Sequence, residues 1–396
     1  MNTIKQEAQA LLPDLHRWRR DLHQMPEVGL QLPQTASYVF AELQKMGYEP
    51  YYLTESGIAA VLEGPHPGRT ILLRADMDAL PMEEDSGLSF SSRNPGASHT
   101  CGHDTHTAML LGAARLLMEH RDQLHGRVKL MFQPGEEDAG GCKQMIDAGV
   151  LENPAPDAAI ALHQVVTRHG MPSGTLGYTA GTAMASADVF RITVRGKACH
   201  GAAPELGISP IHILVQIYNL LQTIEFCEKP RADALSISVG QIHAGTASNI
   251  IPGKGWLSGS IRAYQPATRE LARRRMGEIV SSTAALLGGE AQLEFLSELP
   301  PTCNDPQLGE DLFAYTQELL GPEESVRMDG CMGSEDFAEI TCRVPSVYFR
   351  LSMGSWEEGY HVNSHNGRVL FDESAMPNGA ATYAWCSLRW LEEHAN

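Results

Sequence analysis

Apolar and polar residues follow two different periods along the chain, and each period predicts a different kind of element. Apolar residues recur at helical spacing over 3–24, 34–47 and 104–119, and over a shorter stretch near 141–149. Short, nearly continuous apolar runs lie at 58–63, 69–76, 126–133 and 157–163. Because the runs alternate with helical stretches, this part of the chain predicts an α/β sheet with helices on its faces.

The pattern changes in the middle of the chain. Between Val189 and Arg195 apolar side chains alternate with polar ones, which is typical of a half-buried strand. The patterns that follow predict a helix near 208–227, strands near 234–243 and 255–264, a helix near 267–287 and a strand near 291–298. The order β-α-β-β-α-β is that of the ferredoxin-like split motif, so we predict an inserted domain over residues 184–298.

Helical and strand patterns return after Pro300-Pro301. They predict a helix over 307–320, a strand over 345–350 and a helix over 374–392. With 396 residues the chain is too long for one typical hydrophobic core. We therefore predict one catalytic α/β domain, made of residues 1–183 and 299–396, with the inserted domain as its lid.

Composition and charge exclude several classes of protein. Hydrophobic residues make up 43% of the chain, and no apolar run reaches the roughly 18–20 residues that a membrane span needs. The N-terminus is polar and lacks a signal-peptide pattern, so we expect a cytoplasmic protein with reduced cysteines. The net charge of −18 disfavours nucleic acid and anionic membranes as partners.

Polar side chains follow three of the predicted strands, at the point where each apolar run ends. Asp76 and Asp78 end one run, Glu136-Glu137 follow another after a Gln-Pro-Gly turn, and His163 ends a third. In open α/β sheets, binding sites form beyond the carboxyl ends of the strands. We therefore expect these side chains to lie close together.

The segment Cys101-Gly102-His103-Asp104 immediately precedes a predicted helix, whose N-terminus favours a thiolate. Thiolate, imidazole and carboxylate ligands together suit zinc, manganese, cobalt or nickel, and they differ from the all-oxygen set of calcium. One carboxylate of Glu136-Glu137 can bind a metal while its neighbour transfers a proton, which indicates metal-assisted hydrolysis. A non-catalytic structural metal site is the alternative, but such a site needs no spare carboxylate.

Other catalytic motifs are absent from the sequence. It has no G-x-S-x-G elbow of a serine hydrolase, no phosphate-binding P-loop and no G-x-G-x-x-G dinucleotide fingerprint. Metal-assisted hydrolysis is therefore the chemistry that the sequence supports best.

Eight short motifs resemble those of one enzyme family. They are HRWRRDLHQMPE (16–27), LRADMDALP (73–81), CGHDTHTA (101–108), FQPGEE (132–137), GKACHGAAP (196–204), SNIIP (248–252), GSEDF (333–337) and HNG (365–367). In this order they resemble the metal-dependent aminoacylase/carboxypeptidase family. The resemblance is to its N-acyl-amino-acid amidohydrolase branch, which includes hippurate hydrolases and plant auxin-conjugate hydrolases.

The resemblance implies a fold and an activity. The fold would be a metallopeptidase-type catalytic domain with a mixed sheet and an inserted ferredoxin-like lid. The activity would be hydrolysis of N-acetyl or N-aroyl amino acids to a carboxylate and a free amino acid. A dipeptidase or carboxypeptidase on the same scaffold is the alternative.

The resemblance also implies two divalent metal ions per subunit. Its metal ligands would be Cys101, His103, Glu137, His163 and His365, with Cys101 as a possible bridge. His361 lies close to His365 in the sequence and competes with it for the last ligand position.

Other residues take catalytic and substrate-binding roles from the resemblance. Glu136 would be the general base, and Asp76 would be a carboxylate that orients a ligand histidine. His200 would bind the oxyanion or the substrate carboxylate, and Asn249 and Arg262 would contact polar groups of the substrate. Members of the family often form homodimers through the inserted domain, so His200 would serve its own subunit or the neighbouring one.

Overall fold

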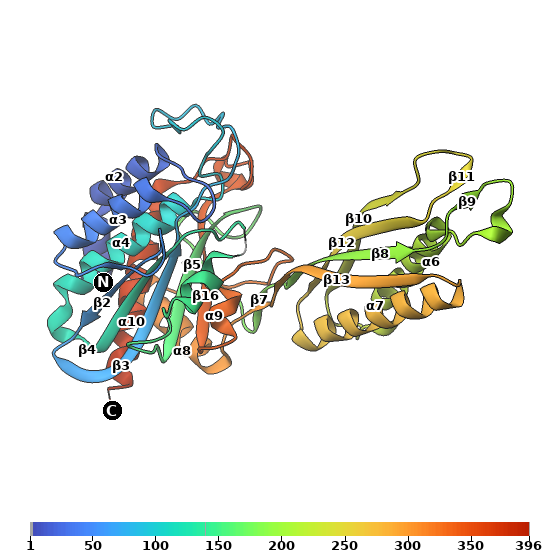
Figure 1. Ribbon diagram of the computed structural model, residues 1–396. Coiled ribbons are helices and arrows are strands. Elements are labelled where there is room, and N and C mark those ends of the chain that lie inside the picture. Colours follow the sequence, from blue (N-terminus) through green and yellow to red (C-terminus); the bar gives the residue numbers. More distant parts are fainter. Residues whose placement is uncertain (1–2, 139, 396) are drawn as a thin grey trace. The chain divides into compact units, whose positions relative to one another are not determined.

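The computed structural model describes residues 3–138 and 140–395 of the chain. The chain divides into two compact units (Figure 1). Unit 1 consists of residues 1–183, 303–329 and 336–396, and unit 2 of residues 184–302 and 330–335. Among the described residues, no helix is both long enough and apolar enough to cross a membrane.

Unit 1 is built on a mixed eight-stranded sheet in the order β1-β2-β4-β3-β5-β16-β6-β15. Its parallel centre consists of β4 (His125–Gln133), β3 (His66–Asp76), β5 (Ala158–Thr167) and β16 (Ser346–Ser355). The flanking strands are β1 (Tyr51–Tyr52), β2 (Ile58–Glu63), β6 (Leu176–Tyr178) and β15 (Ser325–Arg327). Because the four central strands run in the same direction, their carboxyl ends lie along one edge of the sheet.

Long helices bury the faces of this sheet. They are α1 (Thr3–Ala10), α2 (Leu12–His23), α3 (Pro33–Lys45), α4 (His103–Glu119), α8 (Pro306–Leu320) and α10 (Met376–Glu393), with shorter α5 (Gly141–Asp147) and α9 (Ala338–Thr341). Helix α4 packs against α2 and α10, and nearly all of its side chains are buried. A helix that is buried all round shows no polar stripe, which places α4 in the middle of the core.

Unit 2 has its own sheet and its own core. Its elements are β8 (Ala187–Arg195), α6 (Pro210–Thr223), β10 (Leu235–Ala244), β12 (Lys254–Ala263), α7 (Pro266–Leu286) and β13 (Glu290–Leu299). The sheet order is β10-β12-β8-β13 with antiparallel neighbours, and α6 and α7 lie on the same face (Figure 1). The prediction of a ferredoxin-like β-α-β-β-α-β unit is confirmed.

Two small sheets complete the architecture. Strand β9 (Cys199–His200) pairs with β11 (Ile250–Ile251), and β7 (Thr182–Met184) pairs with β14 (Thr302–Cys303).

The structure differs from the sequence prediction in three places. The predicted helix 3–24 is two helices, because Pro13 in the first turn of α2 cannot donate a helical hydrogen bond. Strand β5 continues beyond His163 to Thr167. Unit 2 also contains residues 330–335, since the backbone N–H of Ala185 donates to Cys331 and Arg262 donates to the carbonyl of Met332.

Candidate metal centre

The turn after β4 places two carboxylates at the carboxyl edge of the unit 1 sheet. Gln133, the last residue of β4, lies opposite Asp76, the last residue of β3. The chain then turns, and the backbone N–H groups of Glu136 and Glu137 donate to the carboxylate of Asp78 at 3.0 and 3.1 Å. Asp78 therefore fixes the turn that presents Glu136 and Glu137 to the site.

The start of α4 places a thiol and an imidazole beside these carboxylates. Gly102, between Cys101 and His103, has φ of 80° and precedes the helix as its N-cap. A side chain at this position would be strained, and its Cβ would lie 2.6 Å from Cγ of Gln164. The glycine thus allows the backbone turn that separates the two candidate ligands.

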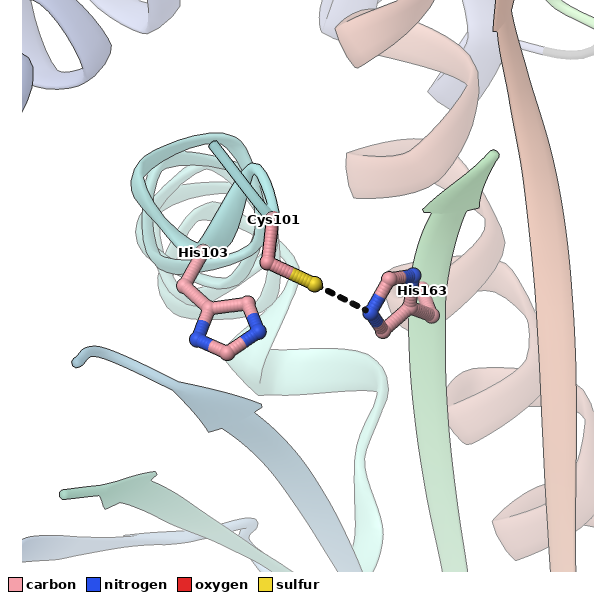
Figure 2. Close-up of side chains that lie close together, drawn as sticks. All are labelled: Cys101, His103 and His163. Carbon is pink, nitrogen blue, oxygen red and sulfur yellow. Dashed lines mark hydrogen bonds between the residues drawn. The ribbon is translucent and has the colours of Figure 1, made fainter. Parts of the chain in front are cut away.

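Cys101, His103 and His163 form a first group of candidate ligands (Figure 2). Their donor atoms all lie within 4.8 Å of one another, and Sγ of Cys101 is 3.6 Å from Nε2 of His163. Nδ1 of His163 lies within hydrogen-bond distance of the carbonyl of Gln164. If Nδ1 donates this hydrogen bond, Nε2 of His163 presents its lone pair towards Cys101.

A second group consists of Cys101, Glu137 and His365, whose donor atoms also lie within 4.8 Å of one another. Nε2 of His365 is 3.3 Å from Oε1 of Glu137. His365 has φ of 63°, in the left-handed region that non-glycine residues rarely adopt and that recurs at ligand-binding positions. Cys101 belongs to both groups, which is the position that a bridging ligand would take.

The surroundings of His103 fit a cation better than they fit a hydrogen-bonded imidazole. Nε2 of His103 is 3.9 Å from oxygen atoms of Asp76, Glu136 and Glu137. This nitrogen is buried without a hydrogen-bond partner among the described residues. Buried polar atoms normally have a hydrogen-bond partner, so this nitrogen is suited to bind a metal ion. With thiolate, imidazole and carboxylate donors, the residues fit divalent metal ions.

The electrostatics of the site favour positive charge. Burial lowers the pKa of His103, but the charges of Asp76 and Cys101 outweigh it and hold that pKa well above its usual range. Burial raises the pKa of the Cys101 thiol. A bound metal would supply the positive charge and keep Cys101 as a thiolate.

The carboxylate beside Nδ1 of His103 is Asp78, at 3.4 Å, and not Asp76. Asp76 instead contacts Nδ1 of His106 at 2.5 Å and accepts a hydrogen bond from Arg74 at 2.7 Å. Nε2 of His106 accepts from the backbone N–H of Gln164, so both of its ring nitrogens are occupied.

The sequence prediction gave the orienting role to Asp76 and none to Asp78 or His106. Both aspartates end the same strand run, and no pattern in the sequence separates them. The H-x-x-H spacing of His103 and His106 within the motif 101–108 is the available signal for His106.

Asp104 turns away from the metal ligands and fastens α4 to α2. Its carboxylate accepts hydrogen bonds from Nε of Arg19 at 3.1 Å and contacts Nδ1 of His23 at 2.8 Å. Burial lowers the pKa of His23, but Asp104 and Glu84 outweigh it and raise that pKa to about 9. These buried ion pairs hold the first turn of α4 in place.

The geometry favours His365 over His361 as the last candidate ligand. His361 is exposed, and its ring lies 5.9 Å from that of Trp356. It belongs to none of the ligand groups found among the described residues.

The substrate-binding candidates lie in unit 2. His200 is exposed in β9, and its Nδ1 accepts from the backbone N–H of Ala202 at 3.0 Å. Asn249 precedes β11, the partner strand of β9, so His200 and Asn249 are neighbours. Arg262 in β12 donates to the carbonyl of Met332 at 2.8 Å, which gives its guanidinium a structural contact within the unit.

Comparison with known proteins identifies relatives across almost the whole chain. The sequence profile of peptidase family M20/M25/M40 matches residues 72–387. Thermostable carboxypeptidase 1 of Saccharolobus solfataricus is 35% identical over 381 residues, which cover 94% of each chain. N-acyl-L-amino acid amidohydrolase of Geobacillus stearothermophilus is 36% identical over 312 residues, covering 77% of this chain and 83% of the relative.

A solved structure agrees with the fold as well. A Bacillus subtilis protein described as a dinuclear metal binding peptidase from the M20 family superposes with a TM-score of 0.84. It is 29% identical, and the alignment covers 97% of this chain and 99% of that one.

Proposed function

The chain belongs to peptidase family M20/M25/M40, and from this we propose that it is a metal-dependent amidohydrolase that cleaves N-acyl amino acids into a carboxylate and a free amino acid. The family and the amidohydrolase relatives make it a hydrolase of amide bonds. The carboxypeptidase relatives favour a second candidate, a carboxypeptidase or dipeptidase acting at the same site.

One observation carries the proposal. Cys101 is common to two ligand groups, one with His103 and His163 and the other with Glu137 and His365. Two groups that share one thiol support a centre for two divalent ions. Zinc, manganese, cobalt and nickel all suit these donors.

The Glu136-Glu137 pair divides into a base and a ligand. Both carboxylates lie near His103, but Glu137 alone also belongs to the group with Cys101 and His365. Because Glu136 lies outside that group, we assign it the transfer of the proton.

In the proposed mechanism, bound metals would polarise the amide carbonyl and lower the pKa of a water molecule. Glu136 accepts the proton of that water and then donates it to the leaving amine. Asp78 orients the imidazole of His103 through its Nδ1, and Asp76 orients the imidazole of His106 in the same way. His200 donates a hydrogen bond to the oxyanion.

A substrate panel tests the proposed function. Metal-reconstituted protein is assayed with N-acetyl and N-benzoyl amino acids beside dipeptides of the same amino acids. We expect the higher kcat/KM for the N-acyl substrates, and removal of metal by a chelator should abolish turnover until metal is restored. Higher kcat/KM for the dipeptides would favour the second candidate.

Replacement of His200 by alanine should lower kcat without changing the metal content. Loss of one oxyanion donor typically costs about 2.7–4 kcal/mol of barrier, which is about a hundredfold to a thousandfold in kcat. Metal analysis by mass spectrometry is the control. Mixing this variant with a Glu136→Gln variant tests whether the residue serves the neighbouring subunit, because recovered activity requires exchange between subunits.

A homodimer through unit 2 is part of the proposal. Strand β10 is an edge of its sheet, and the apolar side chains of Ile242 on this strand and of Val215 and Tyr218 on α6 are 42–51% exposed. An exposed strand edge with an apolar border is a site for pairing with another chain. The cytoplasmic location expected from the sequence stays a prediction.

Charged substitutions on this surface should separate the subunits. Tyr218→Glu combined with Ile242→Lys is expected to give a monomer in sedimentation-velocity experiments. Leu286→Lys, at an 84% exposed position at the end of α7, is the matched control and should leave the mass unchanged. A dimer that survives the double substitution would place the interface elsewhere.

A further inference from the structure

A cavity of about 640 Å³ in unit 1 is lined by four basic side chains and by no acidic one. The basic residues are Arg168, His169, Arg327 and Arg350. This is unusual in a chain with a net charge of −18. Two of the four have carboxylate partners: Glu357 lies 2.7 Å from His169, and Glu310 pairs with Arg327 through two hydrogen bonds.

Arg350 has no such partner. Arg350 is only 8% exposed, and its guanidinium donates to the hydroxyl of Thr179 at 3.1 Å and to the backbone carbonyl of Asp329. Within residues 3–138 and 140–395, no carboxylate lies within ion-pair distance of it. Buried charges are normally paired, so Arg350 is a cation that lacks its anion.

Arg168 adds a second cation at the exposed rim of the cavity. Its guanidinium lies 5.1 Å from the ring centroid of Trp356, and it forms no ion pair with any described residue. A stacked guanidinium keeps its N–H edges free to bind a carboxylate. The two arginines therefore provide charge at the base and at the mouth of one cavity.

One residue that lines the cavity pairs in the sheet with a candidate metal ligand. Arg350 on β16 is the register partner of His163 on the parallel neighbour β5. Paired residues on neighbouring strands point to the same face of a sheet, with backbones about 4.8 Å apart. Val165, two residues after His163, also lines the cavity.

The shape of the cavity depends on a glycine. On the other side of β16, the register partner of Arg350 is Gly177 of β6. A Cβ at Gly177 would lie 2.2 Å from Sδ of Met328 and 3.0 Å from Cε of Met171. Both methionines line the cavity. Because Gly177 has no side chain, the two methionine side chains fit there and form an apolar wall next to the guanidinium of Arg350.

We propose that Arg350, assisted by Arg168, binds a second carboxylate of the substrate, so that the preferred N-acyl amino acids are dicarboxylates. This inference rests on the proposed function and specifies its substrate class. A guanidinium binds a carboxylate through two parallel hydrogen bonds, and the apolar wall fits the methylene groups that carry it. The second carboxylate belongs either to the acyl group or to the side chain of the amino acid.

Three substrates test the proposal on the metal-reconstituted full chain: N-acetyl-L-leucine, N-acetyl-L-glutamate and N-succinyl-L-leucine. We expect kcat/KM for at least one dicarboxylate to exceed that for N-acetyl-L-leucine by about tenfold to a hundredfold, because a hydrogen-bonded charge is gained. The favoured substrate tells which part of the molecule carries the carboxylate. Equal values, or a preference for N-acetyl-L-leucine, would overturn the proposal.

Substitutions of Arg350 test whether this residue causes the preference for dicarboxylates over N-acetyl-L-leucine. Arg350→Gln should reduce the ratio of the two kcat/KM values to about one, mainly through KM of the dicarboxylate. Arg350→Lys should restore part of the ratio. Arg343→Gln is the matched control, because this arginine of unit 1 pairs with Glu339 and does not line the cavity, and it should leave the ratio unchanged. An unchanged ratio in a folded Arg350→Gln variant would refute the assignment.

Direct binding separates this proposal from the proposed function. If none of the three substrates is hydrolysed, the proposed function fails, and the anion site is then tested by calorimetric titration with succinate and with butyrate. Tighter binding of succinate to the wild-type protein, weakened by Arg350→Gln, would retain the site. Equal binding of succinate and butyrate would refute the anion site. If Arg350→Gln does not fold, Arg168→Gln takes its place in both experiments.

Discussion

Replacing Glu136 with glutamine is expected to lower kcat by about 10²–10⁴, the usual contribution of a general acid–base residue. Glutamine keeps the size of the side chain but cannot accept the proton of the attacking water. Because Glu137, and not Glu136, shares a ligand group with Cys101 and His365, metal content should stay at the wild-type level. Steady-state kinetics and metal analysis of the same preparation measure both quantities.

The matched control for this prediction is Glu137→Gln. It should lose metal together with activity, since the carboxylate that contacts His365 at 3.3 Å is removed. Loss of metal from the Glu136 variant and retention of metal by the Glu137 variant would reverse the two assignments.

Replacing Cys101 with serine should remove turnover to background. Serine has nearly the same size, but its hydroxyl is a poor ligand for the metals that thiolates bind. Because Cys101 belongs to both ligand groups, we expect the loss of both ions. The stabilisation that metal gives the folded state should disappear too, so added metal should no longer raise Tm.

Cys342→Ser is the control for reactions of surface thiols. Cys342 is exposed and lies in unit 1 but in neither ligand group. The Cys342→Ser variant should keep its metal and its activity, and added metal should still raise its Tm. A Cys101→Ser variant that still binds two ions would show that the thiol is not shared between them.

The sequence predicts the fold well because the elements of both units carry strong local patterns. The apolar runs of β3, β4 and β5 are the buried parallel centre of the sheet, and the β-α-β-β-α-β order identified unit 2. The periodicity does not predict contacts between segments that are distant in the sequence. Residues 330–335 join unit 2 through hydrogen bonds to Ala185 and Arg262, which no local pattern indicates.

The candidate site is predictable in position but not in detail. Strand ends and the start of α4 indicate where ligands gather, and the structure brings Cys101, Glu137 and His365 within reach of one another. The choice between Asp76 and Asp78 depends on side-chain direction, which the sequence does not encode locally. The sequence does not indicate Arg350 for a related reason. An arginine inside a strand becomes a candidate anion-binding residue only when the structure shows that no carboxylate lies near it.

The number of metal ions needed for activity tests the central claim most directly. Metal-free protein is titrated with manganese or zinc while hydrolysis of an N-acyl amino acid is recorded. A centre shared through Cys101 predicts that activity reaches its maximum at two ions per chain. Full activity in the metal-free protein, or a maximum at one ion per chain, would contradict it.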